Sequence, residues 1–549
     1  PSLVVPDGFT LHSENTSHLL LSSNEAFLNP VQEFNRDLSV ACIRIWCEEL
    51  NLLKETRWKQ AQEKKASKAN ARKRQKASDT CLVENGDAVA SEPAEQEAKD
   101  DSSVPQKKEP QYKPYKPVIL EALSATGLRS IRYAKEIPLV KYVIANDLSS
   151  AATAAMKRNV EFNGFDVGDE KIRINEGDAC TLMYNHREER QRVDVVDVDP
   201  YGTAAPFIDA AVQCVNDGGL LCVTCTDLSV LATNNYPEKC LSNYGGIPVK
   251  AEYCHEAALR LVLHALSTSA SRYGRYIEPL LSLSIDFYVR LFVKVHTSAI
   301  GVKKALTKTS AYFICTSCQS FYEQPLGRVT EKTHEASGNI NYNFRTHPGP
   351  VVSDRCPECE SVLHIAGPMW SGPIHNTDFV AKVLEHVEEN PDSYGTSTRM
   401  KGMLTVAKEE LHTPFYFTPT RIASFFHCQT PSLDEVASAL LHAGYSISRS
   451  HATPGSLKTT STRADLHDIF RSFVKLHPVK LENVSETSPA RKLLAKEPKT
   501  EANFKRHPQS VTASSKVKLV RYQETPHNWG PGSRAVTGTG SKRKRNAED

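Results

Sequence analysis

Apolar positions in the middle of the chain fall into short runs that are separated by stretches of helical length. Between residues 118 and 225 these runs are rich in valine, isoleucine and leucine, and polar or small residues end each one. The pattern predicts five strands, at 118–123, 141–145, 171–174, 193–198 and 219–225. Because strands that alternate with helices form a parallel sheet covered on both faces, residues 118–300 are predicted to be a doubly wound α/β domain.

The strand at 193–198 stops at Asp199-Pro200-Tyr201-Gly202, since proline cannot donate a hydrogen bond to a sheet. In open α/β sheets, ligands bind beyond the carboxyl ends of the strands. Asp199 and the Pro200 carbonyl can accept hydrogen bonds there, and the Tyr201 ring can stack, which together suit a planar base with an exocyclic amine. A proline-initiated turn without a chemical role is the alternative for this motif in isolation.

Two other strand ends carry groups that suit a ligand. A turn of small residues, 124–127, follows the first strand, and its backbone amides can cradle a carboxylate or phosphate. Asp147 ends the second strand, about 20 residues beyond this turn, where an acid can bind ribose hydroxyls. The turn holds a single glycine, Gly127, so its signal depends on the pairing with Asp147.

The N-terminal part is predicted to contain one amphipathic helix, at 31–53, because apolar residues recur there at roughly helical spacing. Arg36 and Asp37 lie on its first turns, where the spacing alone favours a solvated face. Residues 57–117 then form a basic block followed by an acidic one, with few large apolar residues. This composition predicts a disordered charged insertion, whose basic half is either a helical extension in the presence of RNA or a nuclear-import signal.

Four cysteines form two knuckles, Cys315-x-x-Cys318 and Cys356-x-x-Cys359. Two tight pairs of thiolates match a structural zinc site of ribbon type, so residues 301–375 are predicted to bind zinc; unpaired thiols are the alternative. His347 and His364 are alternative zinc ligands in this segment. A further pair at 222 and 225 lies on a predicted strand, where residues three apart face opposite sides, and is assigned to the core.

Residues 376–480 are predicted to be a separate module of helix, helix, strand and basic loop. Many winged-helix nucleic-acid binders have this arrangement, and a plain packing domain fits these residues equally well. The basic residues of interest are Arg421, Arg449, His451 and Lys458. Residues 481–549 are polar, with many serines and lysines, and are predicted to be a mostly disordered basic tail that ends in a nuclear-import or RNA-contact cluster at 542–545.

The composition limits the class of protein. A chain of 549 residues has room for two to four domains. Its net charge is only +3, so any acidic partner has to be bound by local basic patches. The 14 cysteines form no dense framework, which indicates reduced thiols in the nucleus, the cytosol or an organelle matrix. No apolar run approaches the ~20 residues of a membrane helix. Because the chain begins at Pro1, the sequence leaves open whether an N-terminal targeting segment precedes it.

Taken together, these motifs resemble the tRNA (guanine-26 N2)-dimethyltransferases of eukaryotic type. The most specific segment is Ala122-Leu123-Ser124-Ala125-Thr126-Gly127-Leu128-Arg129, and Asp199-Pro200-Tyr201-Gly202 is similar to the family's Asp-Pro-Phe/Tyr-Gly signature. The resemblance also covers 27–37, 147, 178–179, 244–246 and the cysteine knuckles, and more weakly 419–460 and 528–531.

The resemblance implies a Rossmann-like class I methyltransferase domain with a zinc-ribbon-like insert and a C-terminal α+β, winged-helix-like domain that binds tRNA. Residues 1–56 would contribute to the active site. The implied reaction transfers two methyl groups from S-adenosylmethionine to N2 of guanine 26 in tRNA. The protein would act in the nucleus, with the mitochondrion and the cytoplasm as further locations, and no membrane or obligate protein partner is expected.

The resemblance also assigns residues. Arg36 and Arg129 would hold the methionine end of the cofactor, Asp147 its ribose, and Asp178 with Ala179 its adenine. Asp199 would be the catalytic acceptor, aided by the Pro200 carbonyl, and Phe27 and Tyr201 would line the guanine pocket. Leu28 stands where the family usually has an aromatic residue, and Tyr201 where phenylalanine is common, which affects the expected stacking but not the reaction.

Two other functions fit part of the pattern. One is an amine methyltransferase that acts on another RNA or on adenine in DNA, because Asp-Pro-Tyr resembles those sites too; the 126–129 loop argues against it. The other is a non-catalytic, zinc-containing RNA-binding protein with a vestigial cofactor fold. The intact set of Arg36, Asp147, Asp178 and Asp199 argues against that function, and a cofactor titration would distinguish the two.

Overall fold

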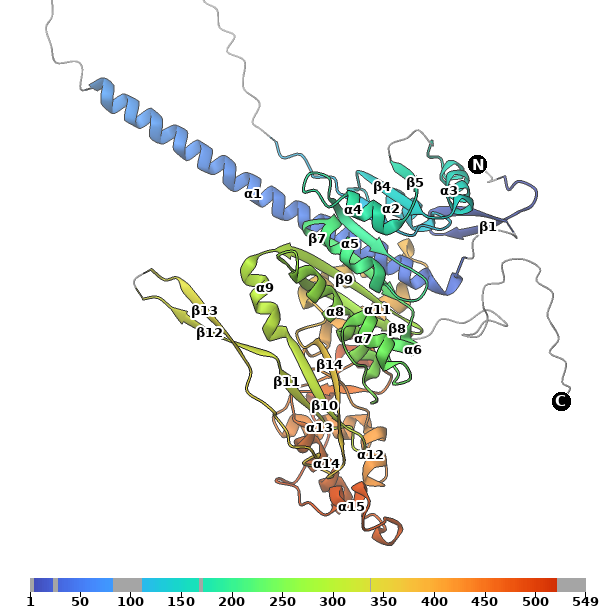
Figure 1. Ribbon diagram of the computed structural model, residues 1–549, viewed down its shortest axis with the longest axis vertical. Helices are drawn as coiled ribbons and strands as arrows, with labels where there is room; N and C mark the ends of the chain where they lie inside the picture. The colour runs from blue at the N-terminus through green and yellow to red at the C-terminus, as the bar shows by residue number, and fades with distance from the viewer. Residues whose placement is uncertain (1–3, 23–27, 82–110, 167–170, 336, 521–549) are drawn as a thin grey trace, which may run out of the picture. The chain divides into compact units, whose positions relative to one another are not determined.

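The computed structural model describes residues 4–22, 28–81, 111–166, 171–335 and 337–520 (Figure 1). Its contacts divide the chain into two units, the first made of residues 1–45 and 117–549 and the second of residues 46–116. Among the described residues, no helix has the length and apolar character needed to span a membrane.

A seven-stranded sheet forms the centre of the first unit (Figure 1). In spatial order its strands are β5 (Ile172–Glu176), β4 (Tyr142–Asp147), β3 (Val118–Glu121), β6 (Val193–Val198), β7 (Val215–Cys225), β9 (Tyr288–Thr297) and β8 (Arg275–Ile285). The first five pair in parallel, whereas β9 is antiparallel to both of its neighbours. The five predicted strands and the α/β prediction are confirmed, and the sheet is mixed because its last two strands form a hairpin.

One helix follows each of β3, β4, β5 and β6, and three helices follow β7. They are α2 (Leu128–Glu136), α3 (Ser150–Phe162), α4 (Ala179–Asn185), α5 (Ala205–Cys214), α6 (Leu228–Leu231), α7 (Pro237–Tyr244) and α8 (Cys254–Ser271). Helices α5 and α8 pack on each other and join the sheet in one hydrophobic cluster. All six residues of β6 are buried, which explains its run of β-branched residues: both faces of the strand are covered.

The central sheet ends in the hairpin β8–β9, whose edge strand contains a proline. The chain reverses between Ile285 and Tyr288, and Pro279 lies inside β8. The pairing with β9 shifts between Pro279 and Leu281. Because β8 is an edge strand, one side of its backbone needs no partner, and a proline is tolerated there.

The N-terminal residues form a hairpin, β1 (Phe9–Glu14) and β2 (Ser17–Ser22), and then helix α1 (Glu33–Cys81). The helix continues through the basic block to Cys81, and a helical basic half is one of the two alternatives that the sequence left open; residues 82–110 lie outside the described residues. In the second unit, the Asn51 side chain donates to the Tyr115 carbonyl (2.9 Å) and accepts from the Tyr115 amide (2.7 Å).

The segment with the cysteine knuckles follows α9 (Ala299–Ala305) and forms two small sheets. One consists of β11 (Phe321–Pro325), β10 (Thr309–Cys315) and β14 (Leu363–Trp370), and the other is the hairpin β12 (Gly327–Thr333) and β13 (Ile340–Thr346).

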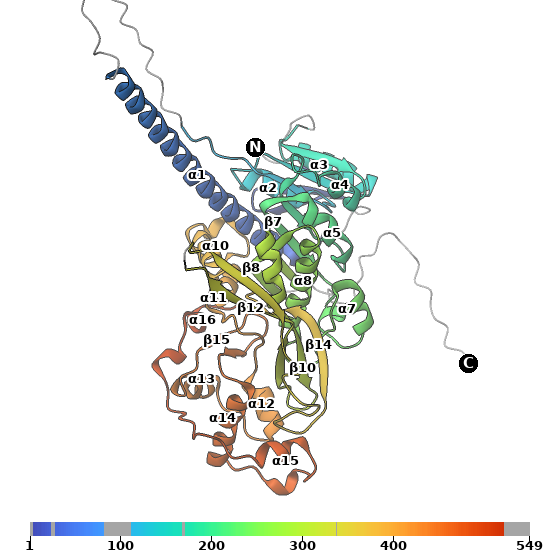
Figure 2. The ribbon, with the colours of Figure 1, turned by 60° about the vertical axis from the view of Figure 1, so that its left-hand side comes forward.

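The last part of the chain is mainly helical and lies beside β10 and β14 (Figure 2). Its elements are α10 (Thr377–Glu389), α11 (Ser397–Glu409), α12 (Pro419–Phe426), α13 (Leu433–His442), β15 (Ile447–Arg449), β16 (Leu457–Thr459) and α14 (Arg463–Leu476). Two further helices, α15 (Pro489–Leu494) and α16 (Ala513–Lys516), fall in the region predicted as a disordered tail. Leu493 is buried in the same hydrophobic cluster as α12 and α14, so that prediction is wrong up to residue 520.

Candidate functional site

A cavity of about 440 Å³ lies at the carboxyl ends of β3, β4 and β6. Six residues that the sequence assigned to the cofactor or the substrate line it: Arg36, Arg129, Asp147, Asp199, Pro200 and Tyr201. Ala179 is buried at the start of α4 and, like Asp178, is not among the lining residues. Phe27 lies outside the described residues. The structure therefore brings most of the predicted site residues together, but the two predicted adenine contacts, Asp178 and Ala179, do not line this cavity.

The turn after β3 is tied directly to the end of β4. Ala125 and Gly127 both have positive φ angles, 47° and 81°, which make the tight turn. The Ala125 amide donates to Asp147 Oδ2 at 2.9 Å. At Gly127 a Cβ atom would come within 3.0 Å of Met156 Cγ, so glycine suits both the backbone angle and the packing. The turn and Asp147, which the sequence predicted to act together, therefore form one wall of the cavity.

Asp199 forms an ion pair with Arg129, just beyond the end of β6. The Arg129 guanidinium also lies 3.8 Å from Asp197 and donates to Ser39 Oγ at 3.1 Å. Asp197 is fully buried beneath it, and Arg290 from β9 donates to Asp197 at 2.8 Å. The two arginines and two aspartates form a line of alternating charge that ends at the cavity.

Arg290 was not predicted as part of the site. It stands between apolar residues in strand β9, and a charge at such a position needs a buried partner, which is the signal that would have found it. Burial alone would raise the pKa of Asp197, but Arg290 and Arg129 hold it below its usual value. Asp197 is therefore ionised, and it fixes the position of Arg129 beneath Asp199.

Glu121, at the end of β3, lines the cavity and was not among the predicted site residues. Its carboxyl group accepts from the Ser130 hydroxyl, and burial raises its pKa to about 8. Near neutral pH this carboxyl group is largely protonated, so it adds no full negative charge to the cavity wall.

Arg36 and Asp37 are 5% and 1% exposed, so the interpretation of a solvated helix face is wrong. Arg36 donates to Glu14 from the N-terminal hairpin (Nε to Oε2, 2.7 Å), and Arg132 pairs with Asp37 at 2.7 Å. Burial alone would raise the pKa of Glu14, but hydrogen bonds from His12 and Arg36 lower it to about 2. The hairpin thus supplies the counter-charge that holds Arg36 at the cavity.

The aromatic ring of the motif is open to solvent. Tyr201 is 83% exposed although it lines the cavity. The next residue, Gly202, has a φ of 87°, and its amide donates to Thr226 Oγ1 at 2.8 Å. A fixed backbone with an exposed ring provides a stacking surface at the cavity mouth, as the sequence predicted for a planar base.

The four cysteines of the two knuckles converge on one buried point. The Sγ atoms of Cys315 and Cys359 are 3.3 Å apart, those of Cys318 and Cys356 are 3.7 Å apart, and all four lie within 4.8 Å of one another. Tetrahedral zinc with Zn–S bonds of about 2.3 Å requires S–S separations of about 3.8 Å. The predicted grouping is confirmed, and its geometry fits a zinc ion.

A second group of possible metal ligands, His375, Glu410 and His451, is buried between the sheet and the C-terminal helices. Both histidines contact Glu410 Oε2, at 3.4 and 2.6 Å, and their other ring nitrogens accept from the amides of Ser282 and Ser284. Their hydrogen-bonding positions are filled, which indicates a structural network.

The same network corrects the prediction that His451 and Lys458 belong to a basic loop for nucleic acid. Lys458 is 0% exposed and lies 3.2 Å from Glu256 and 3.3 Å from Glu410. His451 is 2% exposed. Neither side chain can reach an external ligand, whereas Arg421 is exposed.

Residues 9–471 match the protein family described as N2,N2-dimethylguanosine tRNA methyltransferase. The chain is 44% identical over 515 residues to the tRNA (guanine(26)-N(2))-dimethyltransferase of Schizosaccharomyces pombe, with 93% of this chain and 90% of the relative covered. It is 41% identical over 565 residues to the mitochondrial tRNA (guanine(26)-N(2))-dimethyltransferase of Saccharomyces cerevisiae, with 98% and 94% covered.

The structure is also similar to that of Trm1 from Pyrococcus horikoshii in complex with S-adenosyl-L-methionine. The TM-score is 0.58 at 25% sequence identity, and the match covers 82% of this chain and 97% of the other. The mixed sheet is therefore of the class I methyltransferase type, as the sequence predicted.

Proposed function

The chain belongs to the N2,N2-dimethylguanosine tRNA methyltransferase family, and from this premise we propose how its own residues carry out the reaction. The enzyme transfers two methyl groups from S-adenosyl-L-methionine to N2 of guanine 26 in tRNA. The observation that carries the assignment is the convergence of Arg129, Asp147, Asp199 and Tyr201 on one cavity at the carboxyl ends of the strands.

The residues around the cavity suit S-adenosyl-L-methionine, which when bound supplies a methyl group activated by its sulfonium. Arg36 and Arg129 would hold the methionine carboxylate, and Asp147 would accept hydrogen bonds from the ribose hydroxyls. Asp178 and Ala179 would contact the adenine. They stand two and three residues beyond Glu176, which pairs with Asp147 across β4 and β5. Glu121, protonated near neutral pH, does not repel a carboxylate at Arg129.

Asp199 would orient and deprotonate the guanine amine. The lone pair of this amine is delocalised into the purine ring, so the site has to hold the nitrogen in the reactive orientation and accept a proton as the new bond forms. Asp199 and the Pro200 carbonyl provide two acceptors, and Arg129 keeps the carboxylate in place. Tyr201 would stack on the base, with Phe27 as the second aromatic residue of the guanine pocket. Guanine 26 would be flipped out of the tRNA stack to reach them.

Asp199→Asn tests this assignment. We expect it to lower methyl transfer at least 100-fold, because general-base catalysis contributes about 10²–10⁴. Binding of S-adenosyl-L-methionine, followed by calorimetry, should change little. Asp392→Asn, an exposed aspartate in the short 3-10 helix between α10 and α11, is the control. Mass spectrometry of tRNA nucleosides measures the product, and near wild-type turnover in Asp199→Asn would contradict the role of Asp199.

The remaining parts of the chain have supporting roles in this proposal. The four cysteines bind a structural zinc ion, which links the ends of β10 and β14. Residues 376–480 form the winged-helix-like domain that binds tRNA, with Arg421 as an exposed basic residue. We propose the nucleus as the main location; the basic cluster at 542–545 that supports it lies outside the described residues.

A further inference from the structure

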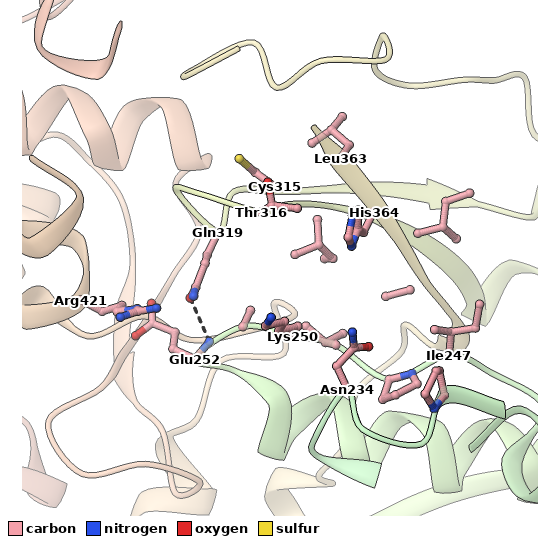
Figure 3. A pocket seen from close by; sticks show the side chains of 17 residues that line it. Asn234, Ile247, Lys250, Glu252, Cys315, Thr316, Gln319, Leu363, His364 and Arg421 are labelled. Atoms are coloured by element: carbon pink, nitrogen blue, oxygen red, sulfur yellow. Dashed lines mark hydrogen bonds between the residues drawn. The ribbon is translucent and has the colours of Figure 1, made fainter. Parts of the chain in front are cut away.

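A second cavity, of about 960 Å³, lies among three parts of the first unit (Figure 3). Its walls are the loop between α7 and α8, the ends of β10 and β14, and the exposed side chain of Arg421 on α12. It shares no lining residue with the cavity of Asp199. Nothing in the proposed reaction uses it.

The walls of this cavity are held by hydrogen bonds within the protein. Ile247 and Gly367 exchange two backbone hydrogen bonds, of 3.0 and 2.9 Å, which join the loop to β14. The Glu252 amide donates to Gln319 Oε1 at 2.9 Å, which joins the loop to the cysteine knuckle (Figure 3). The cavity is thus preformed and does not depend on a ligand to order its walls.

The loop that forms one wall is also connected to the catalytic motif. Helix α7 precedes it and ends at Tyr244, whose hydroxyl contacts Thr203 at 2.7 Å and Asp227 at 2.8 Å. Thr203 comes two residues after Tyr201. A ligand that spans both cavities would therefore contact elements that these hydrogen bonds connect.

The chemistry of the lining has three components. Lys250, His364 and Arg421 are exposed, and Figure 3 shows them on different walls of the cavity. Ile365 on β14 is 57% exposed and offers an apolar surface. The cationic side chains can bind an anionic group of a ligand, and the isoleucine can pack against a flat apolar group.

The third component is a buried acceptor. Glu252 Oε2 accepts from the amide and the hydroxyl of Thr418, at 2.9 and 2.8 Å. Its other oxygen, Oε1, is buried and has no hydrogen-bond partner among the described residues. Figure 3 shows the Glu252 side chain beside Arg421, so this carboxyl group helps to hold the arginine in the wall of the cavity.

We infer that this cavity is a second RNA subsite, which takes one unpaired nucleotide of the tRNA substrate. Its phosphate lies at Lys250 and Arg421, and its base packs on Ile365. A nucleotide combines an anion and a flat ring, which are the two groups that the exposed part of the lining suits. The inference rests on the proposed function, since it takes tRNA as the substrate.

The double variant Lys250→Ala/Arg421→Ala tests the subsite with the full-length enzyme and a tRNA transcript. The KM for tRNA should rise about tenfold or more, while kcat at saturating tRNA stays within about twofold. The slope of log affinity against log salt should fall by about 0.7–0.9 for the phosphate contact that is lost. The matched control is Lys141→Ala/Arg190→Ala, two exposed residues that lie just before the amino ends of β4 and β6, on the edge of the sheet opposite the cavity of Asp199.

A second variant separates the subsite from a general loss of positive charge. Ile365→Asp changes an exposed side chain, so it should leave the melting temperature unchanged, and the new carboxylate should again raise the KM for tRNA. If both variants have wild-type KM values and salt slopes, the inference is wrong, and the cavity serves another ligand such as a peptide. Failure of the wild-type enzyme to methylate tRNA would instead contradict the proposed function, so the two failures are distinguishable.

Discussion

Lys458 provides a quantitative test of how the C-terminal helices are joined to the sheet. Its ammonium group lies between Glu256 and Glu410, and all three side chains are 0% exposed. Arg260 also pairs with Glu256 at 2.7 Å, so the four charges of this buried cluster balance. Lys458→Met keeps the length of the side chain but leaves one uncompensated negative charge in the interior.

We expect Lys458→Met to lower the free energy of unfolding by about 3–5 kcal/mol, the usual cost of breaking a buried ion pair from one side. Removing one carboxylate as well should recover part of this loss, so Lys458→Met/Glu410→Gln should be less destabilised than the sum of its single variants. Urea unfolding followed by circular dichroism measures all three.

The control is Lys475→Met, which removes an exposed lysine that pairs with Glu497. An exposed pair of this kind contributes about 0–1 kcal/mol. If Lys458→Met and Lys475→Met have the same midpoint of unfolding, the buried cluster does not stabilise the protein and the reasoning is refuted.

Two other predictions concern the N-terminal hairpin and the cysteine cluster. The pKa of Glu14 is about 2, below its ordinary value of 4.5, so its stabilising effect is complete above about pH 4.5 and is lost as the pH falls toward 2. Glu14→Gln should therefore be less stable than wild type at pH 7 but nearly equal to it at pH 2; equal stability at both values would contradict the predicted coupling. Cys356→Ser should lower the zinc content, measured by inductively coupled plasma mass spectrometry, from about one ion per chain to well below one, whereas Cys254→Ser should not. Full zinc content in Cys356→Ser would exclude this cluster as the binding site.

Much of the cavity around Asp199 could be predicted because its signals are local in the chain. The valines of β6 and the proline that follows them determine where the strand ends, and they therefore place Asp199 and Tyr201 at the edge of the sheet. The small residues after β3 and the acid at the end of β4 were predictable for the same reason, because each directly follows or ends a strand. In a parallel sheet the carboxyl ends of neighbouring strands meet at one edge, so a local pattern was sufficient to bring these residues together.

The charge partners inside the molecule could not be predicted in this way. Glu14 and Arg36 are 22 residues apart, Asp197 and Arg290 are 93 apart, and Ser39 and Arg290 are 251 apart. Periodicity describes which face of an element is apolar, and a charged residue in such a pattern looks solvated until its partner is known. This is why Arg36 was expected on an exposed face.

The sequence by itself determined five strands of the central sheet, the Asp199-Pro200-Tyr201-Gly202 motif at the end of one of them and the pairs of cysteines, since each depends on residues that are close in the chain. Only the tertiary structure decided that His451 and Lys458 are buried, that Arg290 supports Asp197, and that a second cavity lies beside the cysteine cluster. The physical reason is that burial of a charge and the shape of a cavity depend on packing between distant segments, which no local pattern records.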